Sequence, residues 1–553
     1  MGDLAQLVPP SNLSQLDRET VFDHFFCRLA SYRNTLLLYS NLEHSLSPLN
    51  PQLKDSKRDE FDAEIQVWAQ KLLEHTWIIC GEPGGDKCPE LDPYSDTSTG
   101  QFPPLPAATI VTRILNAIVF LQIAGSKEFS ARTRAFLSTF GTLDEQIIVS
   151  ALKNPTKAIE QAHKQTLEAK DNHAKVGKTL RVVGVGLGAV AGGVLVGVTG
   201  GLAAPFVGAG VSAFLGILGV GGTTAGLLAS GLASSSVICG ALFGAYGATS
   251  SSKMVKRHTR EIRDLDIIPV HKTDNEFETL AVRLCVSGWL TSKEDVIAPW
   301  KVFEGDDTFA LQWEVELLQS LSNALYTLLK TNAMRYIKAQ VIKRTVFAAV
   351  MSSLAPLAWL KIGQIIDNDW MNCNVLARKA GAILGDLLAQ RVFGNRPVNL
   401  TGYSLGALVI WEALKHLASL PPSETAHLIQ DVYLFGTPAP IDAPTWTSIR
   451  RLVSGRVVNG YSENDYVLAV LSRLSNISWG VAGLQPVDVM GVDNVLCKEV
   501  DGHTRWRVMI GRSLQLCGAP GIVNQRVDEQ AEATEDVPGL DITQEEMDQL
   551  VKK

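Results

Sequence analysis

The spacing of apolar residues predicts a helical region at the start of the chain. Between residues 15 and 170 apolar positions recur every three or four residues, as in "DAEIQVWAQKLLEHTWIIC" and "PAATIVTRILNAIVFLQIAG". That period is typical of amphipathic helices, whereas "GEPGGDKCPELDPYSDTSTGQFPPLP" has the composition of a loop. We therefore predict an α-helical N-terminal domain over residues 1–180, in which the polar residues 154–181 form a solvated helix or a weak coiled coil.

A segment without any charged residue follows, from Val182 to Ser252. About 20 apolar residues cross a bilayer, so this glycine-rich stretch has room for two crossings and a turn. Its glycines recur at four-residue spacing, which lets helices pack closely in lipid, and basic flanks favour the cytosolic side. The flanking basic residues are Lys175, Lys178, Arg181, Lys253, Lys256, Arg257, Arg260 and Arg263. We predict a transmembrane hairpin over residues 181–252 with both ends in the cytosol; the alternative is a buried glycine-rich helical pair in a soluble fold.

The pattern changes again after residue 274. Short apolar segments such as "TLAVRLCVSGWL", "PVNLTGYS" and "DVYLFGTPAP" alternate with long helical ones such as "WMNCNVLARKAGAILGDLLAQRV". This alternation predicts an α/β domain over residues 274–518, with a mostly parallel sheet covered by helices on both faces. Residues 519–553 are acidic and poor in aromatic side chains, which predicts a disordered tail.

Charge and cysteine content exclude several function classes. A net charge of −7 offers no basic surface for nucleic acid. The eight cysteines form no metal-binding cluster, so we expect no metal site and no disulfide framework. The segment "VVGVGLGAVAGG" has no acidic residue at the spacing of a dinucleotide site, and "VGKT" lacks the first glycine of a phosphate loop. We expect no cofactor.

Candidate chemistry begins at the sequence Gly402-Tyr403-Ser404-Leu405-Gly406. It matches the G-x-S-x-G nucleophile elbow, with a predicted strand before it and an amphipathic helix after it. The small residues Gly402 and Gly406 would let neighbouring backbones approach at such a sharp turn, which holds the serine hydroxyl above the sheet. The spacing therefore predicts Ser404 as a nucleophile.

A serine nucleophile needs a histidine base, and only three histidines follow Ser404. We expect His416 and His427 on the surface near the helix behind the elbow, so His503 in "VDGHTRWRV" is the predicted base.

The acid should follow a late strand at the carboxyl edge of the sheet, which favours Asp465 after "GRVVNGYSEN". Asp442 is the reserve candidate, Asp431 precedes its strand, and Asp501 is too close to His503 in sequence.

The oxyanion that forms during acyl transfer needs two backbone N–H donors. Leu405, which follows the serine, is the first candidate, and Gly288 and Trp289 after an earlier strand supply the second. An ordinary glycine turn beside a core tryptophan is the alternative. The uncharged residues 345–360 are too short to cross a bilayer, and either a lid helix or a buried helix fits them.

With these residues placed, the sequence resembles the membrane-anchored hydrolase family of transmembrane and coiled-coil domain-containing protein 4 and fungal lipase-like proteins. The resemblance rests on the glycine-rich segment and on "VSGWL", "LTGYSLGA", "LFGTPAP", "VVNGYSENDYVL", "VAGLQPV" and "GH" at residues 502–503. It implies an α/β-hydrolase fold, a Ser404, Asp465, His503 triad, and a lipid or other hydrophobic ester as substrate.

Together the residues and the resemblance predict a serine hydrolase of ester bonds, a lipase or phospholipase, anchored in an intracellular membrane with its catalytic domain facing the cytosol. The membrane bilayer and a lipid are its expected partners. The alternative is a catalytically silent hydrolase scaffold that acts in membrane trafficking or as an adaptor, since a fold does not guarantee its chemistry.

Overall fold

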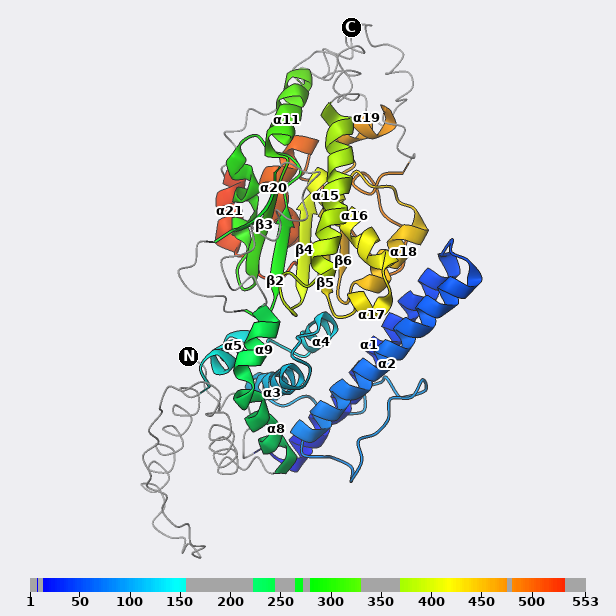
Figure 1. The fold of residues 1–553 in the computed structure, drawn as a ribbon, viewed down its shortest axis with the longest axis vertical. Helices are drawn as coiled ribbons and strands as arrows, with labels where there is room; N and C mark the ends of the chain where they lie inside the picture. Colours follow the sequence, from blue (N-terminus) through cyan, green and yellow to red (C-terminus); the bar gives the residue numbers. More distant parts are fainter. Residues whose placement is uncertain are drawn as a thin grey trace, which may run out of the picture. The chain divides into compact units, whose positions relative to one another are not determined.

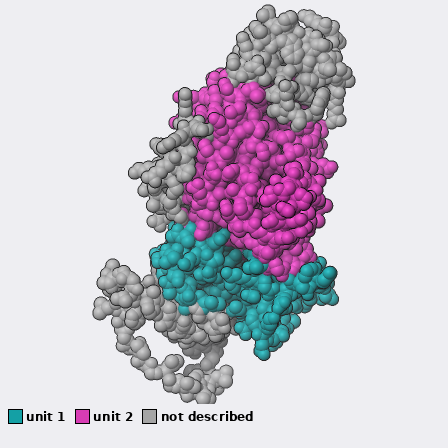
Figure 2. All heavy atoms as spheres, turned by 45° about the vertical axis from the view of Figure 1, so that its right-hand side comes forward, with its two compact units in different colours: residues 1–32, 67–129, 136–242 teal, residues 33–66, 130–135, 243–553 magenta. Residues whose placement is uncertain are grey.

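The computed structural model describes residues 7, 13–155, 222–243, 264–271, 279–329, 369–474 and 480–532. The chain divides into two compact units (Figure 2). The first comprises Met1–Tyr32, Val67–Phe129 and Phe136–Leu242, and the second comprises Arg33–Gln66, Ser130–Ala135 and Phe243–Lys553. The domain boundaries at residues 180, 252, 274 and 518 stay predictions.

The helical region predicted at the start of the chain is confirmed. Its helices are α1 (Gln15–Leu46), α2 (Pro51–Ile79), α3 (Ala108–Ser126), α4 (Ala131–Leu137) and α5 (Glu145–Lys153). The residues between α2 and α3, predicted as a loop, contain no helix or strand. The predicted solvated helix or coiled coil falls almost entirely on residues 156–181, outside the described part.

One described helix, α3, is long and apolar enough to cross a membrane. About 61% of its most apolar window is buried inside the protein, a property that it shares with the core helices of soluble proteins. Its central residues, from Ile114 to Ile123, are all buried. Length and composition alone therefore do not make α3 a membrane span.

Only residues 222–243 of the predicted transmembrane hairpin lie in the described part of the chain. They form α8 (Gly222–Ala233) and α9 (Ser235–Phe243), and the described length of each is less than a bilayer crossing needs. Helix α8 packs against α3, and Gly231 lies so close to Phe120 and Ala124 that a Cβ atom there would stand 2.7 Å from the Ala124 side chain. The number of crossings and their orientation stay predictions.

The predicted mixed α/β architecture with a mostly parallel sheet is confirmed in the second unit (Figure 1). The seven-stranded sheet has the order β1-β3-β2-β4-β5-β6-β7. Only β1 is antiparallel to its neighbour; the other pairs are parallel. The strands are β1 (Leu265–Pro269), β2 (Val282–Val286), β3 (Asp307–Trp313), β4 (Val398–Tyr403), β5 (Ile429–Phe435), β6 (Val457–Tyr461) and β7 (Val492–Leu496). β1 precedes residue 274, where the α/β domain was predicted to begin.

Helices cover both faces of this sheet, which is why every residue of β2, β4 and β5 is buried. On one face α16 (Leu405–Ser419) packs on β2, β4 and β5 and is flanked by α15 (Met371–Ala389) and α18 (Ala443–Leu452). On the other face α20 (Trp506–Leu516) packs on β4 and β5 (Figure 1). The remaining elements are α11 (Val315–Leu329), α17 (Pro422–Thr425), α19 (Tyr466–Leu474), η3 (Lys293–Val296), η4 (Ala298–Val302) and η6 (His503–Arg505).

The prediction of a disordered tail from residue 519 is wrong for residues 519–532. Residues Asn524–Glu532 form α21, which packs on α20 and η4. Val527 is fully buried, and Gln530 donates its side-chain amide to the Pro299 carbonyl. One well-placed apolar residue thus docks a segment whose overall composition is polar. The acidic residues 533–553 lie outside the described part.

A buried ion cluster closes the amino edge of the sheet. The Asp306 carboxylate accepts from Arg134 at 3.0 Å, from Arg283 at 2.9 Å and from the Asn399 amide at 2.9 Å. Burial opposes ionisation of this carboxyl, but the two arginines and Asn399 outweigh it and hold the pKa of Asp306 below its ordinary value. Asp431 lies at the same edge, inside β5, where its backbone N–H donates to Asn399.

Candidate active site

Ser404 stands at a sharp turn between β4 and α16, the strand and helix predicted around it. Its backbone has φ 55° and ψ −132°, a strained conformation for a residue other than glycine, and its side chain is fully buried. A Cβ atom at Gly406 would lie 2.1 Å from the Val286 carbonyl oxygen, and one at Gly402 would lie 2.8 Å from Ile410. Gly406 is therefore required by close backbone packing, whereas at Gly402 the nearest atom is the end of a flexible side chain and the nearest backbone atoms lie at 3.0 Å.

His503 meets Ser404 although 99 residues separate them. The Ser404 hydroxyl and His503 Nε2 are 2.6 Å apart, and both side chains are buried. His503 begins η6, which follows β7 and leads directly into α20. The carboxyl ends of parallel strands meet at one edge of a sheet, so the loops after β4 and β7 bring the two residues together.

Asp465 holds the other side of the imidazole. It follows β6, and its Oδ2 lies 2.7 Å from His503 Nδ1. The same oxygen accepts from Trp506 Nε1 at 3.0 Å, and Oδ1 accepts from the Leu468 N–H at 3.0 Å at the start of α19. Because an ionised carboxylate only accepts, Nδ1 carries the imidazole proton and Nε2 is free to accept from Ser404.

Trp506 is the member of this constellation that the sequence reasoning missed. It lies three residues after His503, at the first turn of α20, and its ring packs on Phe435 of β5 with ring centroids 6.0 Å apart. It also fills the space beside Gly436, where a Cβ atom would lie 2.4 Å from the indole nitrogen. An indole nitrogen needs a hydrogen-bond partner when buried, but only the fold identifies that partner as Asp465.

The loop after β2, residues 287–292, faces the elbow and is called here the elbow-facing loop. A Cβ atom at Gly288 would lie 2.0 Å from the Gly406 nitrogen and 2.3 Å from the Leu405 nitrogen. The Trp289 ring meets the His503 ring edge to face, with centroids 5.7 Å apart. The structure thus brings Leu405, Gly288 and Trp289, the predicted oxyanion residues, to the side of Ser404 and His503.

Tyr403 fastens the elbow-facing loop to β4. Its hydroxyl donates to the Trp289 carbonyl at 3.0 Å. Burial raises the pKa of Tyr403, so the phenol stays protonated and remains a donor at physiological pH.

The reserve acids and the other histidines have different contacts. Asp442 caps α18, accepting from the Thr445 N–H, and Asp501 is half exposed and pairs with Arg505. His416 pairs with Asp386 at 2.8 Å.

His427, predicted as a surface residue, has a side chain that is only 20% exposed. His427 is mostly buried, and its Nδ1 lies 2.7 Å from the Ser130 hydroxyl while its Nε2 lies 3.3 Å from Glu64. This is a second serine, histidine and carboxylate set, but Ser130 directly precedes α4 and its Oγ accepts from the Thr133 N–H. Unlike Ser404, Ser130 does not have a positive φ; in this set it is His427 that has one, at 64°.

The described residues contain no group of three or more His, Cys, Asp or Glu that could hold a metal ion. The eight cysteines are all free thiols, and seven of them are buried. Burial raises the pKa of Cys373 and of Cys517 to about 12, so these thiols stay protonated.

The fold and these contacts define a mixed α/β protein with a buried Ser–His–Asp arrangement at the carboxyl edge of its sheet. The chain belongs to the DUF726 family, described as "Protein of unknown function", whose model matches residues 177–519. This match contains the sheet, the elbow and all three residues of the arrangement.

Three relatives illustrate the family. Uncharacterized membrane protein C6F6.13c of Schizosaccharomyces pombe is 32% identical over 84% of this chain and 79% of its own length. Transmembrane and coiled-coil domain-containing protein STS1 of Oryza sativa is 33% identical over 63% of this chain and 54% of its own. "Probable lipase MIL1" of Saccharomyces cerevisiae is 35% identical over 56% of this chain and 27% of its own.

The chain therefore matches most of the first relative, about half of the second and about a quarter of the third. No solved structure matches the chain.

Proposed function

We propose that this protein is a serine hydrolase of ester bonds with an α/β-hydrolase fold, in which Ser404 is the nucleophile, His503 the base and Asp465 the orienting acid. The observation that carries the proposal is the unbroken contact chain from the strained Ser404 through His503 to Asp465, at 2.6 Å and 2.7 Å. A buried structural serine needs neither the positive φ nor a histidine that is held by a carboxylate.

In the proposed reaction, His503 Nε2 takes the proton of Ser404 Oγ as that oxygen attacks the ester carbonyl carbon. Asp465 stabilises the imidazolium that forms, and the N–H groups of Leu405 and of the Gly288–Trp289 region stabilise the oxyanion. The intermediate collapses when the bond to the alcohol breaks, and His503 returns its proton to that alcohol. Water then attacks the acyl-enzyme by the same route and releases the carboxylic acid.

A lipid is the substrate class that we propose. The charge-free segment from Val182 to Ser252, the names of the membrane-protein relatives and the name of the yeast relative support it. An anchor beside the site would keep a poorly soluble ester within reach. In this proposal the anchor is a hairpin over residues 181–252, and the catalytic domain lies over residues 274–518 on the cytosolic face of an intracellular membrane.

Labelling with a fluorophosphonate probe tests the chemistry without knowledge of the substrate. Wild-type protein in detergent should label covalently, and Ser404→Ala should not. Ser130→Ala is the matched control, because Ser130 is also buried and also contacts a histidine, yet it should leave labelling unchanged. A folded wild-type protein that does not label would overturn the proposal.

Hydrolysis of lipid panels by the wild type and by Ser404→Ala would then identify the ester, and a wild type that cleaves none of them would contradict the lipid assignment. Protease protection of tags at both chain ends in sealed vesicles tests the topology. Both tags should be cleaved from the cytosolic side, and tags on opposite sides would contradict the hairpin.

A catalytically silent scaffold is the second candidate, and the complete burial of Ser404 favours it, since an ester must reach the hydroxyl to react. The labelling experiment separates the two candidates. A scaffold would be folded, bound to membranes and unlabelled, whereas the hydrolase would label.

A further inference from the structure

Asp295 lies just beyond the elbow-facing loop and contacts both ends of it, through one carboxylate oxygen and through its backbone carbonyl. It is only about 3% exposed. Its Oδ2 accepts from the Thr291 N–H at 2.7 Å, from the Thr291 hydroxyl at 2.7 Å and from the Ser292 N–H at 2.9 Å. Its backbone carbonyl accepts from the Ser287 hydroxyl at 2.9 Å. Both ends of the loop are thus tied to one aspartate.

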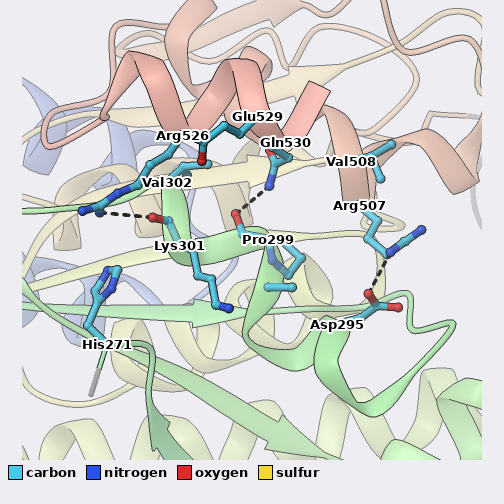
Figure 3. Close-up of a pocket in the computed structure, with 11 residues that line it drawn as sticks. His271, Asp295, Pro299, Lys301, Val302, Arg507, Val508, Arg526, Glu529 and Gln530 are labelled. Atoms are coloured by element: carbon cyan, nitrogen blue, oxygen red, sulfur yellow. Dashed lines mark hydrogen bonds and ion pairs between the residues drawn. The ribbon is translucent and has the colours of Figure 1, made fainter. Parts of the chain in front are cut away.

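The other carboxylate oxygen of Asp295 points away from the loop. Oδ1 accepts from Arg507 Nη1 at 2.8 Å, and the two side chains form an ion pair in the wall of a pocket of about 560 Å³ between η4, α20 and α21 (Figure 3). The Asp295 side chain is 4% exposed and that of Arg507 is 19% exposed. Water therefore screens this pair less than a surface pair.

Arg507 connects this loop to the other half of the site. It is the residue after Trp506, which donates to Asp465, and it lies four residues after His503. The pair consequently joins the elbow-facing loop, which holds Gly288, to the segment that carries the base. These two segments come from distant parts of the sequence.

We propose that Asp295 and Arg507 are positioning residues that hold the elbow-facing loop at the correct distance from Ser404 and His503. This inference rests on the proposed hydrolase function. Neither residue touches the reacting atoms; both act through the backbone of the loop. A shift of about 1 Å in a group that binds the transition state can cost about a hundredfold in rate.

The test compares the rate of fluorophosphonate labelling in Asp295→Asn, Arg507→Gln and the double variant. Each single variant should label about tenfold to a hundredfold more slowly than the wild type. The double variant should be no slower than the slower single one, because both changes break the same connection. Arg507→Lys keeps the charge and can still donate to Asp295, although without the guanidinium geometry, so it should regain part of the rate.

The matched control is Arg512→Gln on the same helix. Arg512 pairs with Asp528 at the surface, where both side chains are about half exposed, so its loss should leave labelling unchanged. The pH midpoint of labelling should also stay where it is in Arg507→Gln. A shifted midpoint would mean that Arg507 acts through its charge on the base, and would overturn the inference.

Hydrogen exchange of the Thr291 and Ser292 amides, which donate to Asp295 Oδ2, provides a readout that needs no activity. These amides should exchange about tenfold faster or more in both single variants, because Asp295→Asn removes the charge that strengthens their hydrogen bonds and Arg507→Gln removes the partner that holds the accepting carboxylate in place. Unchanged exchange, wild-type labelling rates in Arg507→Gln, or additive effects would each overturn the inference. If the folded wild type does not label, the proposed function fails and the positioning role fails with it. If the wild type labels but any of these three results is found, only the positioning role is refuted.

Discussion

Replacing Gly288 by alanine should disable the site through a contact that no side-chain movement can relieve. The added Cβ atom would stand 2.0 Å from the Gly406 nitrogen, 2.3 Å from the Leu405 nitrogen and 2.4 Å from the Tyr403 carbonyl oxygen. All three atoms belong to the backbone of the elbow. The shortest contact must open from 2.0 Å to about 3.4 Å, where ordinary contact begins.

A displacement of that size moves the elbow-facing loop away from the place where an oxyanion would form. Loss of one oxyanion donor costs about 2.7–4 kcal/mol in the transition state, which corresponds to about a hundredfold to a thousandfold in rate. Overpacking should also lower the free energy of unfolding by about 1–3 kcal/mol. We therefore expect Gly288→Ala to fold and to label with fluorophosphonate at least about a hundredfold more slowly than the wild type.

Thermal unfolding and the labelling rate, measured on the same preparation, separate the two effects. Gly141→Ala is the control, since a Cβ atom at Gly141 meets nothing within 4 Å. It should leave both quantities unchanged. If Gly288→Ala labels within about twofold of the wild type, the loop does not contribute to the transition state and the reasoning is refuted.

Three further substitutions test separate parts of the structure. Asp306→Asn should lower the free energy of unfolding by about 3–5 kcal/mol at neutral pH, because it removes the carboxylate that pairs with the buried Arg283 and the partly buried Arg134. A carboxyl pKa that is lower in the folded than in the unfolded state stabilises the folded state above the unfolded-state pKa, and this stabilisation is lost as pH falls through the folded-state pKa. The wild type should therefore lose stability below about pH 4, and the variant should lose less. Urea titrations across pH would record both. Trp506→Phe keeps an aromatic ring but removes a donor to Asp465, so the free energy of unfolding should fall by about 1.5–3 kcal/mol and labelling should be slower. An unchanged labelling rate would mean that Trp506 does not contribute to the site. Val527→Ala should lower the free energy of unfolding by about 2 kcal/mol and speed proteolysis of α21. A cleavage rate equal to that of the wild type would mean that the helix is not docked.

The elements around the candidate site were predictable because their signals are local. Apolar β-branched segments bounded by turn residues indicated β2, β4, β5 and β6, and the glycines on either side of Ser404 indicated the turn between β4 and α16. β7 was not predicted, because "VDNVL" is short and partly polar. It is an edge strand of the sheet, and two of its first three residues are exposed. The helix α21 was missed for a similar reason. Its composition is polar, and its one buried valine docks it only because the fold provides a complementary surface, which the local sequence does not indicate.

Chain order and residue type determined much of this protein's candidate chemistry before any fold was known. With three histidines after Ser404, and two of them near the helix behind the elbow, His503 was the remaining base, and Asp465 was the favoured acid. The choice of Asp465 needed only the rule that functional loops gather at the carboxyl edge of a parallel sheet.

Only the tertiary structure decided which distant groups support those residues. Four contacts join segments whose local sequences do not indicate that they will meet. They are Trp506 with Asp465, Asp295 with the elbow-facing loop, Arg507 with Asp295, and Ser130 with His427. The physical reason is that a buried donor or charge must find a partner, but the identity of that partner depends on which loops the sheet order places side by side. The sequence specifies the need for a partner, and the packing of the strands selects it.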